Sequence, residues 1–299
     1  PDEADEPSRL LDCAEEILVL VASALTGTPT ALLAFGAAAR SLEALLLRGD
    51  EATVLWDAAS ARELGPSAPS LARRASGGTG EVSGVRAYRA ALRLRAAVGE
   101  RVQVVEGSVT AHVAGIGVVA CPCLQSLQNF GIGAQGAVRH AAGPSLEPSL
   151  AALAPPLAPL STTLVQGGAL APGMVAMVVT TPPPPGAPWM EGLRHGHRAW
   201  QTAVSCRLHA TLFAAVRDAG RSSVVMPTLG TGGAGFDVRA VCDGLACALA
   251  MDVRQHPHAP LLLRVACYEP AHCKYVQRAK AQLLELIFDE SLFPYYLAN

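Results

Sequence analysis

The feature of this sequence that most constrains its fold is a glycine-rich stretch directly after an apolar, β-rich segment. Residues 225–237 read V-M-P-T-L-G-T-G-G-A-G-F-D. Glycine tolerates positive φ and lacks Cβ, so successive N–H groups in such a loop can converge on an anion. A helix that follows from Asp237 would add its N-terminal dipole. The stretch therefore predicts a strand, a phosphate-binding loop and a helix in succession.

A second glycine-rich turn lies at 129–143, which reads N-F-G-I-G-A-Q-G-A-V-R-H-A-A-G. It runs directly into a helix of small residues that ends at Gly143. Two such turns can hold a diphosphate from both sides. The pair therefore predicts a site for a phosphorylated ligand.

Together the two stretches resemble the signatures of the macro domain, the ADP-ribose-binding α/β module. Its G-G-G-V-D-x-A-I-H-x-A-A-G signature falls on Gly131 to Gly143, and its P-A-I-S-T-G-V-Y-G-Y-P signature falls on Pro227 to Asp237, both without a gap. Its G-D-I-T turn and N-A-A-N strand end fall on 102–110 and 118–123. The resemblance covers about 100–290. It implies an α/β fold with a three-layer α/β/α mixed sheet.

Strands and helices alternate along the chain, which is the pattern of a sheet covered on both faces. The Pro-rich segments 144–160 and 182–188 should be surface connections, because proline cannot continue a helix or a central strand. The predicted strands are 102–106, 113–119, 162–166, 174–180, 222–228 and 261–267, and the predicted helices are 134–142, 196–218, 238–253 and 271–287.

The sequence predicts an N-terminal region 1–85, a macro-like domain 86–290 and a C-terminal tail 291–299. The first region is apolar and helical over 8–60 and then rich in Gly, Pro and Ser. A faint echo between 54–77 and 118–143 allows a degenerate tandem copy. Chance similarity between Ala-rich helices is the alternative that we favour.

The resemblance implies that ligand contacts come from the two glycine turns, the turn near 108 and the strand end at 123. Several polar positions of the family differ in this chain: Ser108 replaces an Asp, Cys123 replaces an Asn and Gln135 replaces an Asp. The implied ligand-binding residues are Ser108, Val109, Cys121, Cys123, Gly131, Ile132, Gly133, Ala134, Gln135, Gly230, Thr231, Gly232, Gly233, Ala234, Gly235 and Phe236.

No residue presents itself as an obvious general base for hydrolysis. Asp237 follows the glycine loop, but a helix cap is the role that its position favours. His112 and His140 fit structural or surface roles, and Cys121 and Cys123 have no base partner in the sequence. We therefore assign no catalytic residue and lean towards a protein that is not an enzyme.

Composition sets limits on partners and location. The 299 residues are 51% hydrophobic and carry a net charge of −2, so no global basic field attracts nucleic acid. RNA is a weak alternative partner, through Arg89, Arg93 and Arg95. The most apolar run, 30–48, contains charged residues, so we expect no membrane contact.

Eight cysteines are scattered without the spacing of a disulfide framework or a zinc ribbon. We read them as core thiols in a reducing compartment, which predicts an intracellular protein, cytoplasmic or nuclear, without a metal or a cofactor. The acidic start at Pro1 predicts a piece of a larger protein or tandem array.

Three functions remain open. The leading one is binding of ADP-ribose or ADP-ribosylated protein without hydrolysis. The second is a mono-ADP-ribosyl hydrolase with atypical catalytic groups, and the third is a ligand-free structural or protein-interaction domain.

Overall fold

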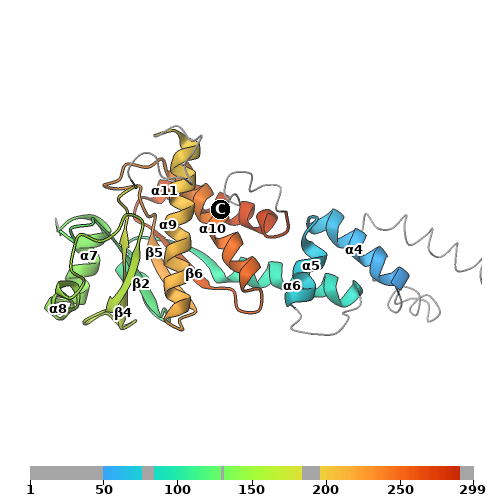
Figure 1. The fold of residues 1–299 in the computed structure, drawn as a ribbon, viewed down its shortest axis with the longest axis horizontal. Helices are drawn as coiled ribbons and strands as arrows, with labels where there is room; N and C mark the ends of the chain where they lie inside the picture. Colours follow the sequence, from blue (N-terminus) through green and yellow to red (C-terminus); the bar gives the residue numbers. More distant parts are fainter. Residues whose placement is uncertain (1–49, 76–83, 129–130, 184–195, 290–299) are drawn as a thin grey trace, which may run out of the picture. The chain divides into compact units, whose positions relative to one another are not determined.

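The computed structural model describes residues 50–75, 84–128, 131–183 and 196–289 (Figure 1). The chain divides into two compact units, and each is described by itself. Among the described residues, the N-terminal unit comprises 50–75, 84–96 and 287–289, and the sheet unit comprises 97–128, 131–183 and 196–286. The predicted boundary after residue 85 lies at the start of α6 Gly84–Arg101. The two units divide within this helix, between Ala96 and Ala97.

The sheet unit is built on a six-stranded mixed sheet in the order β1-β6-β5-β2-β4-β3. All neighbouring strands are parallel except β3, which runs antiparallel to β4 at one edge. The strands are β1 Val102–Glu106, β2 Val118–Cys123, β3 Thr162–Gln166, β4 Met174–Val179, β5 Ser223–Pro227 and β6 Leu262–Cys267.

Helices cover both faces of this sheet, which confirms the predicted three-layer α/β fold (Figure 1). On one face, Val138 and Ala142 of a short helix pack into a core with Val119, Cys121 and Val225. Two long helices, α9 and α10, pack against each other on the other face, and α11 packs against α10, β1 and β6. The helices and 3-10 turns are η2 Val109–His112, α7 Gly133–Ala142, η3 Pro144–Leu146, α8 Glu147–Ala151, α9 Arg198–Asp218, α10 Val238–Gln255 and α11 Pro270–Leu286.

The strand after η2 begins later than the sequence predicts. We expected it over 113–119, whereas β2 spans Val118–Cys123. The chain first turns at Gly115, where φ is +71°, and Gly117 N then donates to Ser223 Oγ at 2.8 Å. The segment 144–160, expected to be a surface connection, contains η3 and α8, which place Leu146 and Leu150 in the core.

The described residues of the N-terminal unit form helices joined by turns, without a strand. It contains α4 Asp50–Leu64, α5 Ala68–Ala75 and the first part of α6 Gly84–Arg101. Buried Trp56 and Tyr88 pack with ring centroids 5.4 Å apart. Residues 54–60 lie in a helix, whereas the segment that they echo, 118–123, is a strand. The structure therefore gives no support to a degenerate macro-like copy there.

No helix within the described ranges has both the length and the apolar character needed to cross a membrane.

Helices α9 and α10 approach each other closely at Gly244. A Cβ at this position would lie 2.7 Å from Cys206 N, from Ser205 Cβ and from Thr202 O. The absence of a side chain at Gly244 therefore sets the spacing between the two helices.

We expect Gly244→Ala to lower the free energy of unfolding by roughly 2 kcal/mol, because overpacking forces the helices apart. Urea denaturation measures this change. Gly99→Ala in α6 is the matched control, because a Cβ there meets open space and alanine favours a helix. Equal stability of the two variants would contradict this account of the interface.

His209 is fully buried in α9. Its Nδ1 donates to Ser205 O at 2.7 Å, and its Nε2 has no hydrogen-bond partner among the described residues. Burial lowers the pKa of His209 to about 4 from an ordinary value of 6.5. The folded protein therefore holds a neutral imidazole.

This lowered pKa predicts a loss of stability in acid. Below about pH 6.5 the histidine is protonated in the unfolded chain but stays neutral in the folded protein. The free energy of unfolding therefore falls as the pH drops, by roughly 3 kcal/mol in total near pH 4. His209→Leu should remove this part of the acid sensitivity, whereas His140→Gln, at an exposed position, should retain it. Denaturation at pH 7 and pH 4.5 measures both, and an unchanged pH dependence in His209→Leu would contradict the assignment.

Candidate functional site

The two glycine-rich turns leave the sheet from neighbouring strands. Strands β2 and β5 are parallel, with Val118 paired to Val224 and Val119 to Val225. The segment after β2 leads into α7, and the segment after β5 leads into α10. Parallel neighbours end at the same edge of a sheet, where α/β proteins commonly bind ligands. This shared edge is the candidate site.

The turn after β5, residues 228–237, is held in a compact shape by its own backbone. Phe236 N donates to Gly230 O at 3.0 Å, and Gly235 N donates to Gly232 O at 2.8 Å. Gly230 has φ +91°, and a Cβ there would lie 2.8 Å from Cδ2 of Phe236. The ring of Phe236 in turn packs edge-on against Trp200 of α9, with centroids 6.0 Å apart.

The tip of this loop exposes backbone donors. Among the described residues, no acceptor lies within hydrogen-bonding range of the N–H groups of Gly232, Gly233 or Ala234. Gly232 and Gly233 are exposed, and the space beside each Cα is open. Three consecutive N–H groups without partners form a site suited to an anion.

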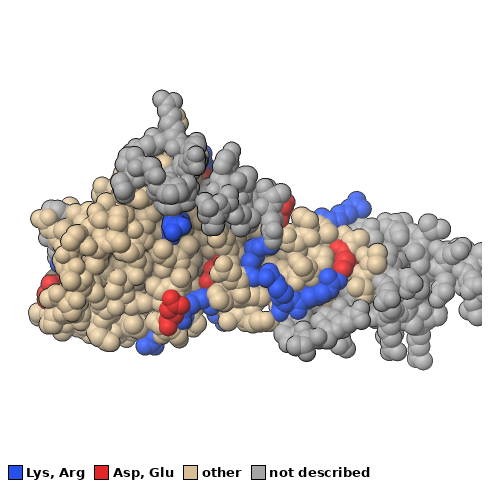
Figure 2. All heavy atoms as spheres, in the orientation of Figure 1, with Lys and Arg blue, Asp and Glu red and all other residues tan. Residues whose placement is uncertain are grey.

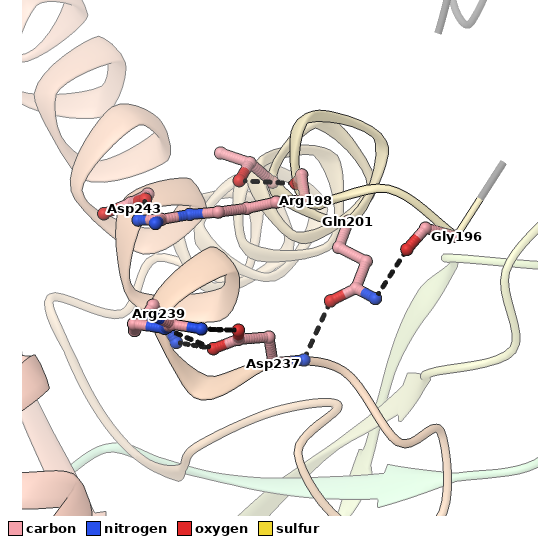
Figure 3. Close-up of polar contacts among 7 residues, drawn as sticks. Gly196, Arg198, Gln201, Asp237, Arg239 and Asp243 are labelled. Atoms are coloured by element: carbon pink, nitrogen blue, oxygen red, sulfur yellow. Dashed lines mark hydrogen bonds and ion pairs between the residues drawn. The ribbon is translucent and has the colours of Figure 1, made fainter. Parts of the chain in front are cut away.

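The loop ends in a helix cap that α9 holds in place (Figure 3). Asp237 Oδ1 accepts from Arg239 N at 2.8 Å, and the Arg239 guanidinium pairs with the same carboxylate. Asp237 N donates to Gln201 Oε1 at 2.8 Å, and Gln201 Nε2 donates to Gly196 O. The hydrogen bonds from Arg239 lower the pKa of Asp237 to about 2. The predicted role of Asp237 as the cap of α10 is confirmed.

The turn before α7 also presents open backbone donors. Ile132 is its N-cap and supplies no capping side chain, while Gly136 N donates to Ile132 O. Within the part of the chain that the structure describes, the N–H groups of Gly133, Ala134 and Gln135 have no acceptor. They lie at the positive end of the α7 dipole, which favours an anion. The side chain of Gln135 is already used, because its Nε2 donates to Gln128 O at 3.0 Å.

The turn after β1 lies beside this edge. Its 3-10 turn, η2, contacts α7, β5 and β6. Ser108 caps η2, and its Oγ lies 2.9 Å from Thr110 Oγ1. The Val109 side chain is buried in the core, so only its backbone is available to a ligand.

The two cysteines of β2 face the core between the sheet and α7. Cys121 and Cys123 are both buried. Burial raises the pKa of Cys123 to about 12 and that of Cys121 still further. Both thiols are therefore protonated at neutral pH and are unsuited to act as nucleophiles. No group of three or more His, Cys, Asp or Glu side chains in the described ranges is placed to hold a metal ion.

Sequence reasoning did not select Tyr268 or His272. Tyr268 directly follows the last residue of β6 and is 82% exposed, so its ring is free to stack on a planar group. His272, in the first turn of α11, contacts Thr228 at the start of the glycine loop. An aromatic residue directly after the predicted strand 261–267 was the available signal for Tyr268.

The basic residues proposed for RNA lie in α6, in the N-terminal unit. Figure 2 shows Lys and Arg side chains gathered where Figure 1 places α5 and α6. Arg89 and Arg93 are exposed and one helical turn apart, but exposed Arg95 points to a different side of α6. Tyr88, the aromatic residue next to Arg89, is buried and is not available to stack on a nucleobase.

Of the comparisons with known proteins, the one with solved structures gives matches. The chain is similar in structure to macrodomains. The Oceanobacillus iheyensis macrodomain with ADP matches with 19% identity and a TM-score of 0.49, over 61% of this chain and 90% of that one. The Trypanosoma brucei macrodomain in complex with ADP-ribose matches with 17% identity and a TM-score of 0.49, over 60% of this chain and 68% of that one. No family profile and no curated protein matches the sequence.

The close contact between Gly230 and Phe236 generates a stability prediction. Gly230→Ala should lower the free energy of unfolding by roughly 2 kcal/mol, because the new Cβ collides with the Phe236 ring at a positive φ. Thermal unfolding checks this. Gly233→Ala is the matched control in the same loop and should stay within about 0.5 kcal/mol, because its Cβ meets open space. A loss at Gly233 as large as that at Gly230 would contradict the observed loop geometry.

Proposed function

We propose that this protein binds ADP-ribose, free or attached to a protein, and does not hydrolyse it. The observation that carries the proposal is the set of partnerless N–H groups at Gly232, Gly233 and Ala234, in the loop after β5, the strand next to the one that leads to α7. Backbone donors of this kind bind phosphate oxygens independently of side-chain identity.

The two groups of donors fit the diphosphate of such a ligand. The loop after β5 supplies one group, and the N-terminus of α7 supplies the other, at Gly133, Ala134 and Gln135. The nearby arginines are already engaged: Arg239 pairs with Asp237, and Arg139 donates to Leu127 O. Binding would therefore depend on backbone dipoles more than on net charge.

The remainder of the ligand has two candidate contacts. Tyr268 offers an exposed aromatic ring at the end of β6, and a ring of this kind stacks on a nucleobase for about 1–3 kcal/mol. Ser108 offers a hydroxyl in place of the family's carboxylate. A neutral hydroxyl accepts a hydrogen bond from an adenine amine less strongly than a carboxylate, so we expect weaker discrimination between bases.

The carboxylate that directly follows the loop argues against hydrolysis. Asp237 is used as a helix cap and pairs with Arg239, and its pKa of about 2 makes it a weak base at neutral pH. Asp237 is therefore unsuited to activate water.

Calorimetry with ADP-ribose tests the proposal. Gly232→Glu should weaken binding more than tenfold, because it places a carboxylate where the phosphate would lie. Gly232→Gln separates size from charge and should bind better than Gly232→Glu. Gly99→Glu, with the same charge change at an open position of α6, should bind like the wild type. Absence of heat and of a melting shift in the wild type would refute ligand binding.

Hydrolysis is tested on a mono-ADP-ribosylated protein. We expect the label to remain after hours with stoichiometric protein. Its removal by the wild type, together with loss of this activity in Gly232→Glu, would instead establish a hydrolase.

A further inference from the structure

A row of side chains connects the start of α11 to the glycine loop. His272 Nδ1 lies 3.4 Å from Thr228 Oγ1, and His272 Nε2 lies 3.2 Å from Glu269 Oε2. The imidazole is mostly buried, with 16% of the side chain exposed, whereas the Glu269 side chain is 70% exposed. The loop thus rests against an ionisable group from a different element.

The row continues from Thr228 into the turn that opens the loop. Thr228 Oγ1 lies 3.0 Å from Thr231 Oγ1. Thr231 Oγ1 donates to Thr228 O at 2.9 Å, and Thr231 N points to the same oxygen at 3.4 Å. These contacts fix the residue that immediately precedes the open N–H of Gly232.

The number of hydrogens decides which contacts can form together. Four contacts need one hydrogen each: His272 with Glu269, His272 with Thr228, the two threonine hydroxyls with each other, and Thr231 with Thr228 O. The two hydroxyls supply one hydrogen each and a neutral imidazole supplies one more, which leaves one contact unfilled. An imidazolium supplies two, and all four contacts then form.

We propose that His272 is a positioning residue whose doubly protonated ring completes the row and fixes the turn 228–231 for the diphosphate. In this state Nε2 donates to Glu269, Nδ1 donates to Thr228, and Thr228 donates to Thr231. This inference rests on the proposed function, because it assigns the loop to phosphate binding. It makes ligand affinity depend on pH.

Other ionisable groups lie on the elements around α11. They include Glu106 at the end of β1, Cys267 at the end of β6, and Asp237, Arg239, Cys242 and Asp243 at the start of α10. Asp237 and Arg239 pair with each other. Within the described residues, Glu269 is the one carboxylate whose oxygen lies within 4.0 Å of an imidazole nitrogen of His272.

The test is the affinity for ADP-ribose measured by calorimetry at pH 6 and pH 8, the range in which histidine exchanges protons. The diphosphate of ADP-ribose has no ionisable proton there, so the ligand does not contribute a slope of its own. Wild-type protein should bind about fivefold more tightly at pH 6, the effect of one net hydrogen bond.

Two pairs of variants isolate the row. Thr228→Val keeps the shape of the side chain but removes the hydroxyl, and it should bind more weakly without a pH slope. Thr228→Ser retains the hydroxyl and should restore both affinity and slope. His272→Asn keeps a donor to Thr228 but cannot ionise, so its binding should be independent of pH. His112→Asn, which removes another histidine at this edge, should keep the wild-type slope.

The outcomes separate the two proposals. Wild-type binding that is equal at pH 6 and pH 8, or a slope that survives in His272→Asn, would overturn the role of His272 and leave ligand binding intact. A Thr228→Val variant that binds like Thr228→Ser would also overturn it. No binding at either pH would overturn both proposals.

Discussion

The site depends on the parallel pairing of β2 with β5. This pairing brings together two segments about a hundred residues apart in the chain, 118–123 and 223–227, and makes their following turns leave the sheet at the same edge. A different strand order would separate the two sets of backbone donors, whatever the sequence of each turn. The side-chain core beneath, from Val119 to Val225, maintains the pairing.

The glycine loop is shaped from the α9 side as well as by its own backbone. Trp200 packs against Phe236, and Gln201 accepts from Asp237 N, so successive residues of α9 hold the end of the loop. Helix α9 is in turn fixed on α10, where Arg217 forms a two-pronged ion pair with buried Asp252 at 2.6 Å. The loop that carries the exposed N–H groups is thus held by the packed pair of helices α9 and α10.

Much of the sheet unit could be predicted because each strand and helix carries its own periodic pattern. The bounds of β1 and β3 match the predicted 102–106 and 162–166, since apolar runs and flanking turn residues define them locally. The sequence did not predict α5, because Gly, Pro and Ser around it suggest a loop, whereas Leu71 and Ala72 are buried by tertiary packing.

The site was predicted less completely, for a related reason. The glycine turns are visible in the sequence, but the burial of Cys121 and Cys123 follows from α7 covering β2, which no local pattern specifies. Similarly, His272 meets Thr228 only because β6 lies next to β5. Under the proposed function, the two groups of amide donors would each contact one phosphate of the ligand. A nucleoside monophosphate would then fill only one group at a time, so the spacing of the main chain would select for the number of phosphates.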